Sequence, residues 1–310
     1  MKPSWRRLSG LLLVMSALIL AVAACGGDDD GDGGGEAAKA DTPIIVGTKN
    51  FPEQFILGEL YKQALEAKGY TVSIKSNIGS TEIIDKALTS GQINFYPEYT
   101  GTSVTVVFGK EGGDSAESTY DAAKEGYEGR GQTLLAMTPF SDSDALAVRK
   151  EDADANGLKE IGDLKGFKGG AFKLGGQPEF TTRDQGLPGL EKNYELTSIE
   201  FVPFAGISPY EALDQKKVDV AAIFSTDPPL ASGKYVVLED TAAQFGFQNI
   251  APVVAQTIVD ALGSEFEDTV NAVSEKLTEE AIIAMNSAVA IDQQQPADVA
   301  KQFLEENDLL

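Results

Sequence analysis

The sequence predicts an α/β protein of two lobes with a ligand cleft between them. The chain has 310 residues, which is long for one simple core and natural for two. Strand and helix patterns alternate in two separate stretches, and a group of helices follows the second stretch. Open α/β sheets bind ligands beyond the carboxyl ends of their strands. Two such edges facing each other would form a cleft that hinge motion could close.

The N-terminus has the features of a bacterial lipoprotein signal. A basic start precedes an apolar stretch at residues 11–22, and Ala23 and Ala24 stand immediately before Cys25. We therefore expect residues 1–24 to be removed and Cys25 to carry a lipid that tethers the protein to the outer face of a membrane. The alternatives are an ordinary signal peptide and a spanning helix. The second is disfavoured because the apolar stretch is shorter than the ~20 residues that cross a bilayer.

The composition excludes several classes of function. The chain has 48 acidic and 25 basic residues and a formal net charge of −23, which argues against binding to nucleic acid or to anionic lipid headgroups. It contains no histidine, so a Ser-His-Asp triad, a Cys-His pair and a histidine-based zinc site are excluded. A single cysteine cannot form an internal disulfide. Carboxylate-based catalysis stays open, as a minority interpretation.

Residues 25–41 are predicted to be a flexible tether. They are rich in glycine and aspartate and have no large apolar side chain that would anchor them to a core. The aspartates lack the ligand spacing and the closing glutamate of a calcium loop. We therefore expect neither a metal site nor a cofactor.

The first folded stretch alternates regularly between strands and helices. Short apolar runs bounded by glycine or polar residues predict the strands, and Pro52 and Ser80 mark the starts of two helices whose apolar residues recur with helical spacing. This order predicts a parallel sheet. Strands are expected over 44–46, 71–75 and 93–96, and helices over 52–68 and 80–88.

A second stretch repeats the α/β pattern, and the chain then returns to the first lobe. We expect the first lobe to comprise residues 42–142 and 253–310 and the second to comprise 143–252, joined by crossovers near 142–146 and 250–255. Strands are expected over 145–148, 169–172, 218–224, 235–238 and 253–255, and helical segments over 161–164, 210–215, 259–285 and 296–304.

Polar and aromatic residues follow three strands of the first stretch. Lys49 and Phe51 come after the first strand and open a helix, where an ammonium beside free N–H groups would suit an anion. Ser80 and Thr81 repeat this arrangement at the next helix. The alternative for each is a capped surface turn. The aromatic rings and hydroxyls of residues 96–102 fit ligand binding better than core packing.

Two features of the second stretch are weaker indications. Residues 169–176 are dense in glycine but lack the Gly-Lys-Ser/Thr ending of a phosphate loop, so they indicate tight turns around a strand. Arg183 has a planar guanidinium that suits two-point binding of a carboxylate. Taken alone, it is better interpreted as a surface arginine.

Together these segments resemble the extracytoplasmic substrate-binding proteins of glycine betaine, carnitine and choline ABC importers. The resemblance extends from about Pro43 to Leu304, and the run from Tyr96 to Thr102 is its most specific part. The residues that carry it are Gly47-Thr48-Lys49-Asn50-Phe51, Tyr96-Pro97-Glu98-Tyr99-Thr100-Gly101-Thr102, Pro178-Glu179-Phe180 with Arg183, and Val218-Asp219-Val220 running into Ser225-Thr226-Asp227.

The resemblance implies a two-lobed, type II periplasmic-binding-protein fold. It also implies a cage of tyrosine faces that holds a quaternary ammonium group by cation–π attraction, with a lysine, a threonine and an arginine for a ligand carboxylate. On this chain the cage role falls to Tyr99. The carboxylate roles fall to Lys49, Thr102 and Arg183.

Three positions depart from the tyrosine pattern of that family. Asp144 and Phe224 stand where tyrosines are usual, and a third tyrosine is replaced around Phe247 and Gln248. Phe224 still offers an aromatic face. Asp144 could neutralise a cation by charge and accept a hydrogen bond, which would suit a ligand with an N–H group or a bulkier betaine.

We therefore expect a lipid-anchored, monomeric binding protein that captures a small cationic or zwitterionic solute and delivers it to an ABC permease and its ATPase. One alternative keeps this role but binds an amino acid, a polyamine or a bulkier betaine such as ergothioneine, with Asp144 facing the ammonium. Another is a carboxylate-based enzyme that uses Glu98 and Asp144. A third is a ligand-sensing lipoprotein without a transport role.

Overall fold

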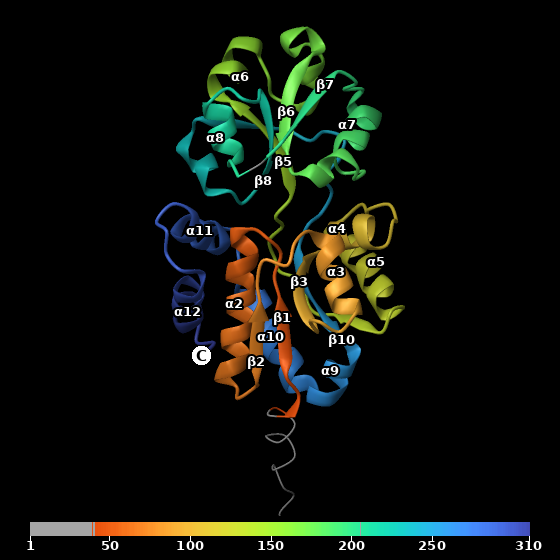
Figure 1. The fold of residues 1–310 in the computed structure, drawn as a ribbon, viewed down its shortest axis with the longest axis vertical. Coiled ribbons are helices and arrows are strands. Elements are labelled where there is room, and N and C mark those ends of the chain that lie inside the picture. Colours follow the sequence, from red (N-terminus) through yellow and green to blue (C-terminus); the bar gives the residue numbers. More distant parts are fainter. Residues whose placement is uncertain (1–38, 40, 205) are drawn as a thin grey trace, which may run out of the picture.

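The structure is a computed structural model that describes residues 39, 41–204 and 206–310. These residues form two lobes stacked along the longest axis of the molecule (Figure 1). Each lobe is built on one five-stranded sheet with helices around it, so the predicted two-lobed α/β fold is confirmed. The predicted signal at residues 1–24, the lipidated Cys25 and nearly all of the predicted tether lie outside the described residues.

The sheet of the first lobe is mixed and not parallel throughout. β1 runs parallel to β2 and β3, as predicted, whereas β10 runs antiparallel to its neighbours β3 and β4. β10 returns from the second lobe and enters the sheet from the opposite direction. The order in the sheet is β2 (Val72–Lys75), β1 (Ile44–Gly47), β3 (Phe95–Tyr99), β10 (Ile250–Ala255) and β4 (Gln132–Leu134).

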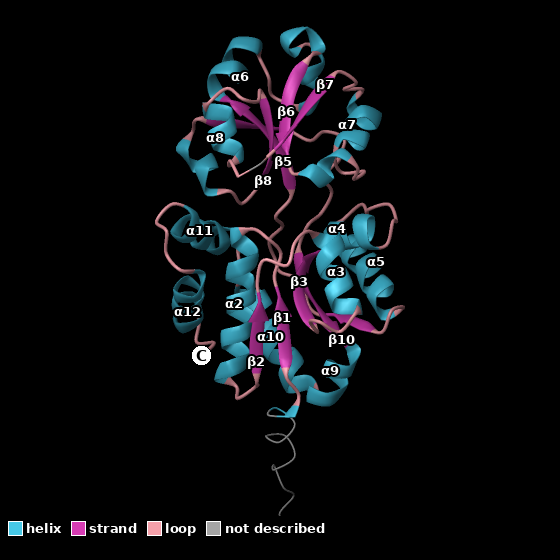
Figure 2. Cartoon of the chain, in the orientation of Figure 1, coloured by secondary structure: helices cyan, strands magenta, loops and turns pink. Residues whose placement is uncertain are grey.

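Helices cover both faces of this sheet (Figure 2). Phe95 and Val254 pack in the core on the α2 and α10 face, while their neighbours Tyr96 and Val253 pack in the core on the α3 and α5 face. No helix in the described part of the chain is both long and apolar enough to cross a bilayer. The helices of this lobe are α2 (Pro52–Ala67), α3 (Thr81–Thr89), α4 (Thr100–Thr102), α5 (Ala116–Glu128), α9 (Gln256–Leu262), α10 (Ser264–Lys276), α11 (Glu279–Ala290) and α12 (Pro296–Glu306), with a π-helical turn at Ser103–Val107.

The second lobe repeats the mixed arrangement. β6 runs parallel to β7 and β8, and β5 runs antiparallel to β8 and β9. The order is β7 (Ile199–Pro203), β6 (Phe172–Gly176), β8 (Val220–Phe224), β5 (Asp144–Arg149) and β9 (Tyr235–Leu238). The helical segments are α6 (Lys150–Asn156), α7 (Leu187–Tyr194), α8 (Pro209–Asp214) and short 3₁₀ turns at Ile161–Lys165, Phe167–Gly170, Pro178–Thr181 and Pro228–Ser232.

Two expectations about this lobe need correction. The strand predicted over 169–172 begins only at Phe172, because Gly169 and Gly170 take φ values of 75° and 86° and form the turn that precedes it. The lobe boundary expected after residue 252 falls inside β10, all of which belongs to the sheet of the first lobe. The return crossing therefore ends before Ile250.

The two crossing segments run close together between the lobes. Ser141 and Asn249 form an isolated antiparallel bridge between them. The buried Asn249 side chain donates hydrogen bonds at 3.0 Å to the carbonyls of Thr138 and Phe140. These contacts tie the outgoing and returning chains into one connection, on which the lobes can move relative to each other.

Candidate ligand-binding site

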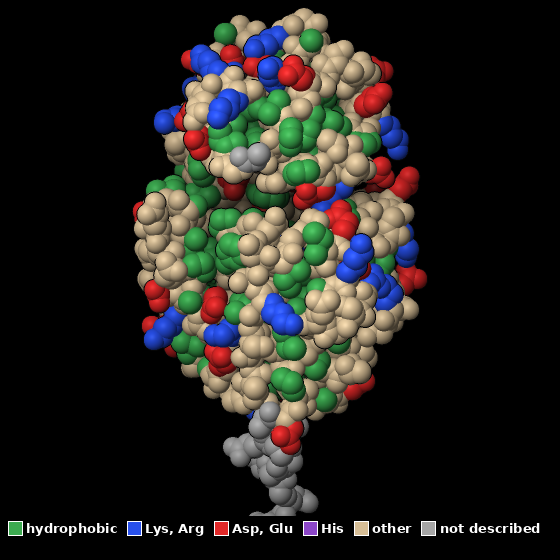
Figure 3. All heavy atoms as spheres, in the orientation of Figure 1, with side chains coloured by type: hydrophobic (Ala, Val, Ile, Leu, Met, Phe, Trp, Pro, Cys, Tyr) green, Lys and Arg blue, Asp and Glu red, His purple; other side chains and the backbone are tan. Residues whose placement is uncertain are grey.

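A pocket of about 130 Å³ lies between the lobes, at the level of the groove that Figure 3 shows on one face of the molecule. Both sheets contribute to it because the strand edges that meet there carry polar and aromatic residues. Asp144 opens β5 and pairs in register with Phe224 at the end of β8, while Tyr99 ends β3. The principal lining residues are Lys49, Phe51, Ser80, Thr81, Tyr99, Thr102, Asp142, Asp144, Gln177, Glu179, Phe180, Arg183, Gln185, Phe224 and Gln248.

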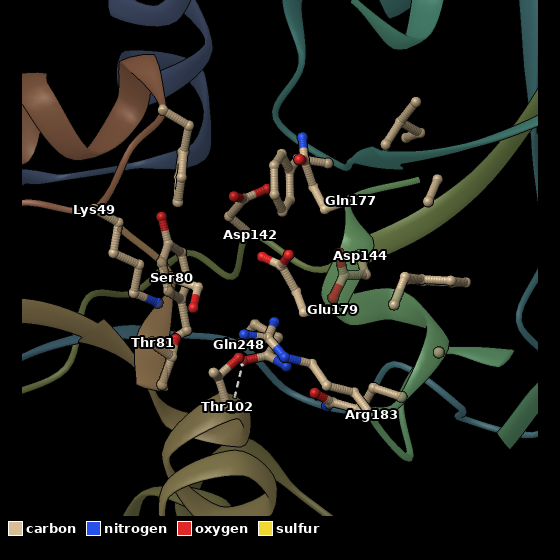
Figure 4. Close-up of a pocket in the computed structure, with 18 of the residues that line it drawn as sticks. Lys49, Ser80, Thr81, Thr102, Asp142, Asp144, Gln177, Glu179, Arg183 and Gln248 are labelled. Carbon is tan, nitrogen blue, oxygen red and sulfur yellow. Dashed lines mark hydrogen bonds between the residues drawn. The ribbon is translucent and has the colours of Figure 1, made fainter. Parts of the chain in front are cut away.

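All of the ligand-binding residues predicted from the sequence line this pocket except Phe247. The Phe247 residue is 37% exposed, and it is the carbonyl of Phe247 that receives a hydrogen bond, from the Thr100 hydroxyl at 3.3 Å. The placement of Phe247 in the pocket is therefore corrected. Its neighbour Gln248, buried with its side chain toward Thr102, holds the position instead (Figure 4).

Three aromatic rings from the two lobes come together at the pocket. The rings of Phe51 and Phe224 stack with centroids 5.2 Å apart and an interplanar angle of 22°. Phe51 also contacts Tyr99, at 6.1 Å between centroids. Phe51 sits immediately before α2 and Phe224 ends β8, so this contact joins the first lobe to the second. Aromatic faces of this kind attract cations.

Lys49 is buried and already has a carboxylate partner. Its ammonium forms an ion pair with Glu98, which is completely buried, and lies 4.6 Å from the centroid of the Tyr99 ring. Burial lowers the pKa of Lys49, and the Glu98 carboxylate opposes this effect. The charge of Lys49 is therefore balanced within the protein.

Arg183 also has a partner, and this partner comes from the opposite lobe. Its Nε and Nη2 atoms donate to Oε1 of Glu82 at 3.2 and 3.1 Å, and Nη2 donates to Oε2 at 3.0 Å. Glu82 lies in the first turn of α3, and the Ser80 hydroxyl contacts its Oε2 at 2.5 Å. Partial burial would raise the pKa of Glu82, but the hydrogen bonds from Arg183 and Ser80 outweigh it and hold the pKa at about 2. Glu82 is therefore ionised.

Thr102 makes its polar contacts with Gln248. The backbone N–H and the hydroxyl of Thr102 both donate to Oε1 of Gln248, at 2.9 and 3.2 Å. The amide nitrogen of Gln248 donates to the carbonyl of Phe245 at 3.3 Å. A ligand carboxylate would have to share the Thr102 hydroxyl with this glutamine.

The second lobe contributes two carboxylates that have no partner in the described part of the chain. Asp144 and Glu179 line the pocket, and their side chains make no hydrogen bond or ion pair with any described residue. In Figure 4 they lie on the second-lobe side of the pocket, with Lys49 on the opposite side. Burial raises the pKa of Asp144 to about 6, while Arg183 and Lys49 act to lower it. Asp144 is therefore mostly ionised at neutral pH.

A buried polar network fixes the orientation of Tyr99. Glu53, in the first turn of α2, accepts the Tyr99 hydroxyl at 2.9 Å with one oxygen. Its other oxygen accepts the Thr226 hydroxyl at 2.8 Å and the Asn286 amide at 2.9 Å. Asp142 accepts a hydrogen bond from the backbone N–H of Thr226 at 3.2 Å. Burial, and to a smaller extent the nearby Glu53, raises the pKa of Asp142 well above its usual range. The network links both lobes and is bonded to one of the three rings through the Tyr99 hydroxyl.

Several pocket residues were missed by the sequence argument. Asp142 lies two residues before the predicted Asp144, in an acidic run, and Glu179 and Phe180 lie in a segment that was noted only for its resemblance. Gln177 and Gln185 flank that segment, and no sequence pattern marked them as candidate site residues. For all of these residues except Asp142, closeness to Arg183 in the sequence was the one feature that could have indicated a place in the pocket.

A two-lobed α/β fold with a pocket between the lobes is the arrangement found in solute-binding proteins. Residues 42–306 match the family described as the substrate binding domain of the ABC-type glycine betaine transport system. The chain is 32% identical over 283 residues to the glycine-betaine-binding protein of Pseudomonas aeruginosa, covering 88% of this chain and 90% of that one. The chain belongs to this family of transporter substrate-binding proteins.

Two further similarities extend the comparison. A crystal structure titled glycine betaine/carnitine/choline ABC transporter superposes with a TM-score of 0.70 at 23% identity, covering 86% of this chain and 99% of that one, and it supports the fold. The ergothioneine transport permease/ergothioneine binding protein EgtU of Helicobacter pylori is 26% identical over 86% of this chain, which corresponds to 48% of that longer protein. The chain is thus the solute-binding component of a glycine betaine-type ABC transporter.

Proposed function

We propose that the protein captures a small quaternary ammonium solute between its lobes, as a lipid-anchored monomer, and delivers it to its permease. The observation that carries this proposal is the meeting of Phe51, Tyr99 and Phe224 beside the carboxylate of Asp144 in one pocket between the lobes. A quaternary ammonium cannot donate hydrogen bonds, so aromatic faces and a nearby negative charge are the groups that suit it.

The environment of Tyr99 supports binding of a cation. The ammonium of Lys49 already lies over this ring, at 4.6 Å from its centroid. A desolvated cation–π contact contributes ~2 kcal/mol, and Asp144 adds an attraction between opposite charges. Together these contacts favour a ligand that places a positive charge near the three rings.

Contacts across the cleft support a capture mechanism based on lobe closure. Phe51 stacks on Phe224, and Glu53 accepts the Thr226 hydroxyl, so residues of both lobes meet at the pocket. An opened molecule would lose these contacts, and a ligand that touches both lobes would favour the closed form. The closed surface then differs from the open one, which gives a permease a means of recognising the loaded protein.

A bulkier betaine with an N–H group, such as ergothioneine, is a second candidate. The unpartnered carboxylates of Asp144 and Glu179 favour it, because they can accept hydrogen bonds that a trimethylammonium group cannot donate. The similarity to the Helicobacter pylori ergothioneine binding protein supports the same candidate. Both candidates share the aromatic site for the quaternary nitrogen.

A thermal-shift screen of the purified chain tests the proposal. The panel contains glycine betaine, choline, carnitine, ergothioneine, basic amino acids and polyamines. A ligand at 1,000 times its Kd adds ~4 kcal/mol to the stability of the folded state, so the expected result is a large upward shift of Tm with the quaternary ammonium compounds. The largest shift with ergothioneine would favour the second candidate. A shift confined to primary amines would contradict both.

The lipid anchor is a separate part of the proposal and has its own test. Cys25 follows Ala23 and Ala24 at the end of an apolar stretch. We expect Cys25→Ser to move the protein from the membrane fraction to the soluble fraction of cells, because serine offers no thiol for acylation. Fractionation and immunoblotting measure this change. Membrane association that persists in the variant would contradict lipidation at Cys25.

A further inference from the structure

The two cations of the pocket are both committed to carboxylates of the protein itself. Lys49 pairs with the buried Glu98, and Arg183 pairs with Glu82 from the other lobe. Two acidic side chains of the pocket, Asp144 and Glu179, have no such partner among the residues that the structure describes. The charge left for a ligand in this pocket is therefore negative.

The contact between Arg183 and Glu82 has the form that a ligand carboxylate would need. Both oxygens of Glu82 are bonded to the guanidinium, at 3.0 to 3.2 Å. A planar guanidinium binds a carboxylate in this two-point manner, and a second carboxylate cannot take the same edge. Ser80 contacts Glu82 at 2.5 Å, and the N-terminal turn of α3 favours a negative charge there.

We propose that Glu82 is a specificity-determining residue that occupies the Nε and Nη2 edge of Arg183 and makes the pocket select quaternary ammonium ligands without a carboxylate. This inference rests on the proposed function and names the ligand class of that same site. Glu82 acts as an intramolecular competitor of a ligand carboxylate for Arg183. Because it is attached to the same chain, its effective concentration at Arg183 is far above that of a free solute.

The carboxylates on the second-lobe side of the pocket also disfavour a ligand that carries a carboxylate. A zwitterion whose ammonium lies on the aromatic rings would bring its carboxylate near Asp144 and Glu179 if it could not reach Arg183. Like charges at short range in a poorly solvated site repel each other. A ligand with a hydroxyl in place of the carboxylate avoids this repulsion and can donate a hydrogen bond to either acid.

Choline and glycine betaine provide the test, because both carry a trimethylammonium group. Choline has a hydroxyl where glycine betaine has a carboxylate. Calorimetric titration of the full chain is expected to show at least tenfold tighter binding of choline. Glu82→Gln keeps the side-chain shape and removes the charge. It is expected to tighten glycine betaine binding at least tenfold and to change choline binding less than threefold.

Asp85→Asn is a matched control. Asp85 lies on the same helix, α3, and both its oxygens accept hydrogen bonds from Nη2 of Arg130, at 2.9 and 3.0 Å, but this pair lies within the first lobe and outside the pocket. The control removes one acid and one arginine contact from α3 as Glu82→Gln does. The ratio of the two affinities is expected to stay at the wild-type value.

The alternative outcomes separate this inference from the proposed function. An affinity ratio that is the same in Glu82→Gln as in the wild type would overturn the specificity role. An equal loss for both ligands would also overturn it, because the pair would then serve only to hold the lobes together. If the wild-type chain bound neither compound nor ergothioneine, the proposed function itself would fail, and the inference would fail with it.

Discussion

Replacing Lys49 with methionine is expected to lower the free energy of unfolding by about 3–5 kcal/mol. Glu98 is completely buried and pairs with Lys49 across the end of the first sheet. One oxygen of Glu98 also accepts the backbone N–H of Tyr99 at 2.9 Å, and its other oxygen has no hydrogen-bond partner among the residues that the structure describes. Without the Lys49 ammonium, the Glu98 carboxylate would remain buried with one backbone donor. The free-energy cost of removing it from water would then destabilise the folded state of the variant.

Chemical denaturation at neutral pH measures this loss, and a double-mutant cycle assigns it to the pair. Glu98→Gln alone would leave the Lys49 ammonium buried without its carboxylate, so we expect a loss of similar size. The double variant Lys49→Met with Glu98→Gln leaves no unpaired charge. It should lose clearly less than the sum of the single variants. Single losses below about 1 kcal/mol would show that water screens the pair and would contradict its burial.

The positions of the site residues could be predicted because they follow strand ends. Lys49, Tyr99 and Phe224 each come at or just after the end of an apolar run, and the ends of such runs meet at the ligand-binding edge of an α/β sheet. Asp144 is found at the same edge because β5 begins where β8 ends. Strand boundaries are a local property of the sequence and were sufficient for Lys49 and Tyr99, whereas Phe224 and Asp144 were identified through the resemblance to the family.

The partners of the two cations could not be predicted in this way. Arg183 was interpreted as a group for a ligand carboxylate, but Glu82 takes it, from 101 residues away and from the other lobe. Glu98 lies 49 residues from Lys49. Whether an arginine is free or paired depends on the closure of the two lobes. That is a tertiary property which no spacing in the sequence records.

The direction of the strands was the feature of the fold that could not be predicted fully from the sequence. The alternation of strands and helices predicted the parallel pairs that β1 makes with β2 and β3. The apolar run of Val253, Val254 and Ala255 was predicted to be a return strand, but its antiparallel pairing with β3 depends on the side from which the chain crosses back. Hydrophobic periodicity reports burial and is silent about direction.

Replacing Tyr99 with alanine is expected to weaken binding of choline by at least 30-fold. The ring contacts Phe51 and lies at the end of β3, facing the pocket. Loss of one desolvated cation–π contact, at ~2 kcal/mol, corresponds to roughly that factor. The variant also removes the surface over which the Lys49 ammonium lies, so the remaining cavity would admit water. Calorimetric titration of the folded variant, with folding checked by circular dichroism, measures the change.

Tyr99→Phe is the matched control because it keeps the aromatic face and removes only the hydroxyl that donates to Glu53 at 2.9 Å. Loss of that hydrogen bond leaves a buried carboxyl oxygen without its Tyr99 donor, which costs about 1–3 kcal/mol, and the bond does not touch the ligand face of the ring. We expect choline binding within threefold of wild type and a lower Tm. If Tyr99→Phe lost binding as severely as Tyr99→Ala, the hydroxyl network of Glu53 and Thr226 would determine affinity, and the aromatic ring would not.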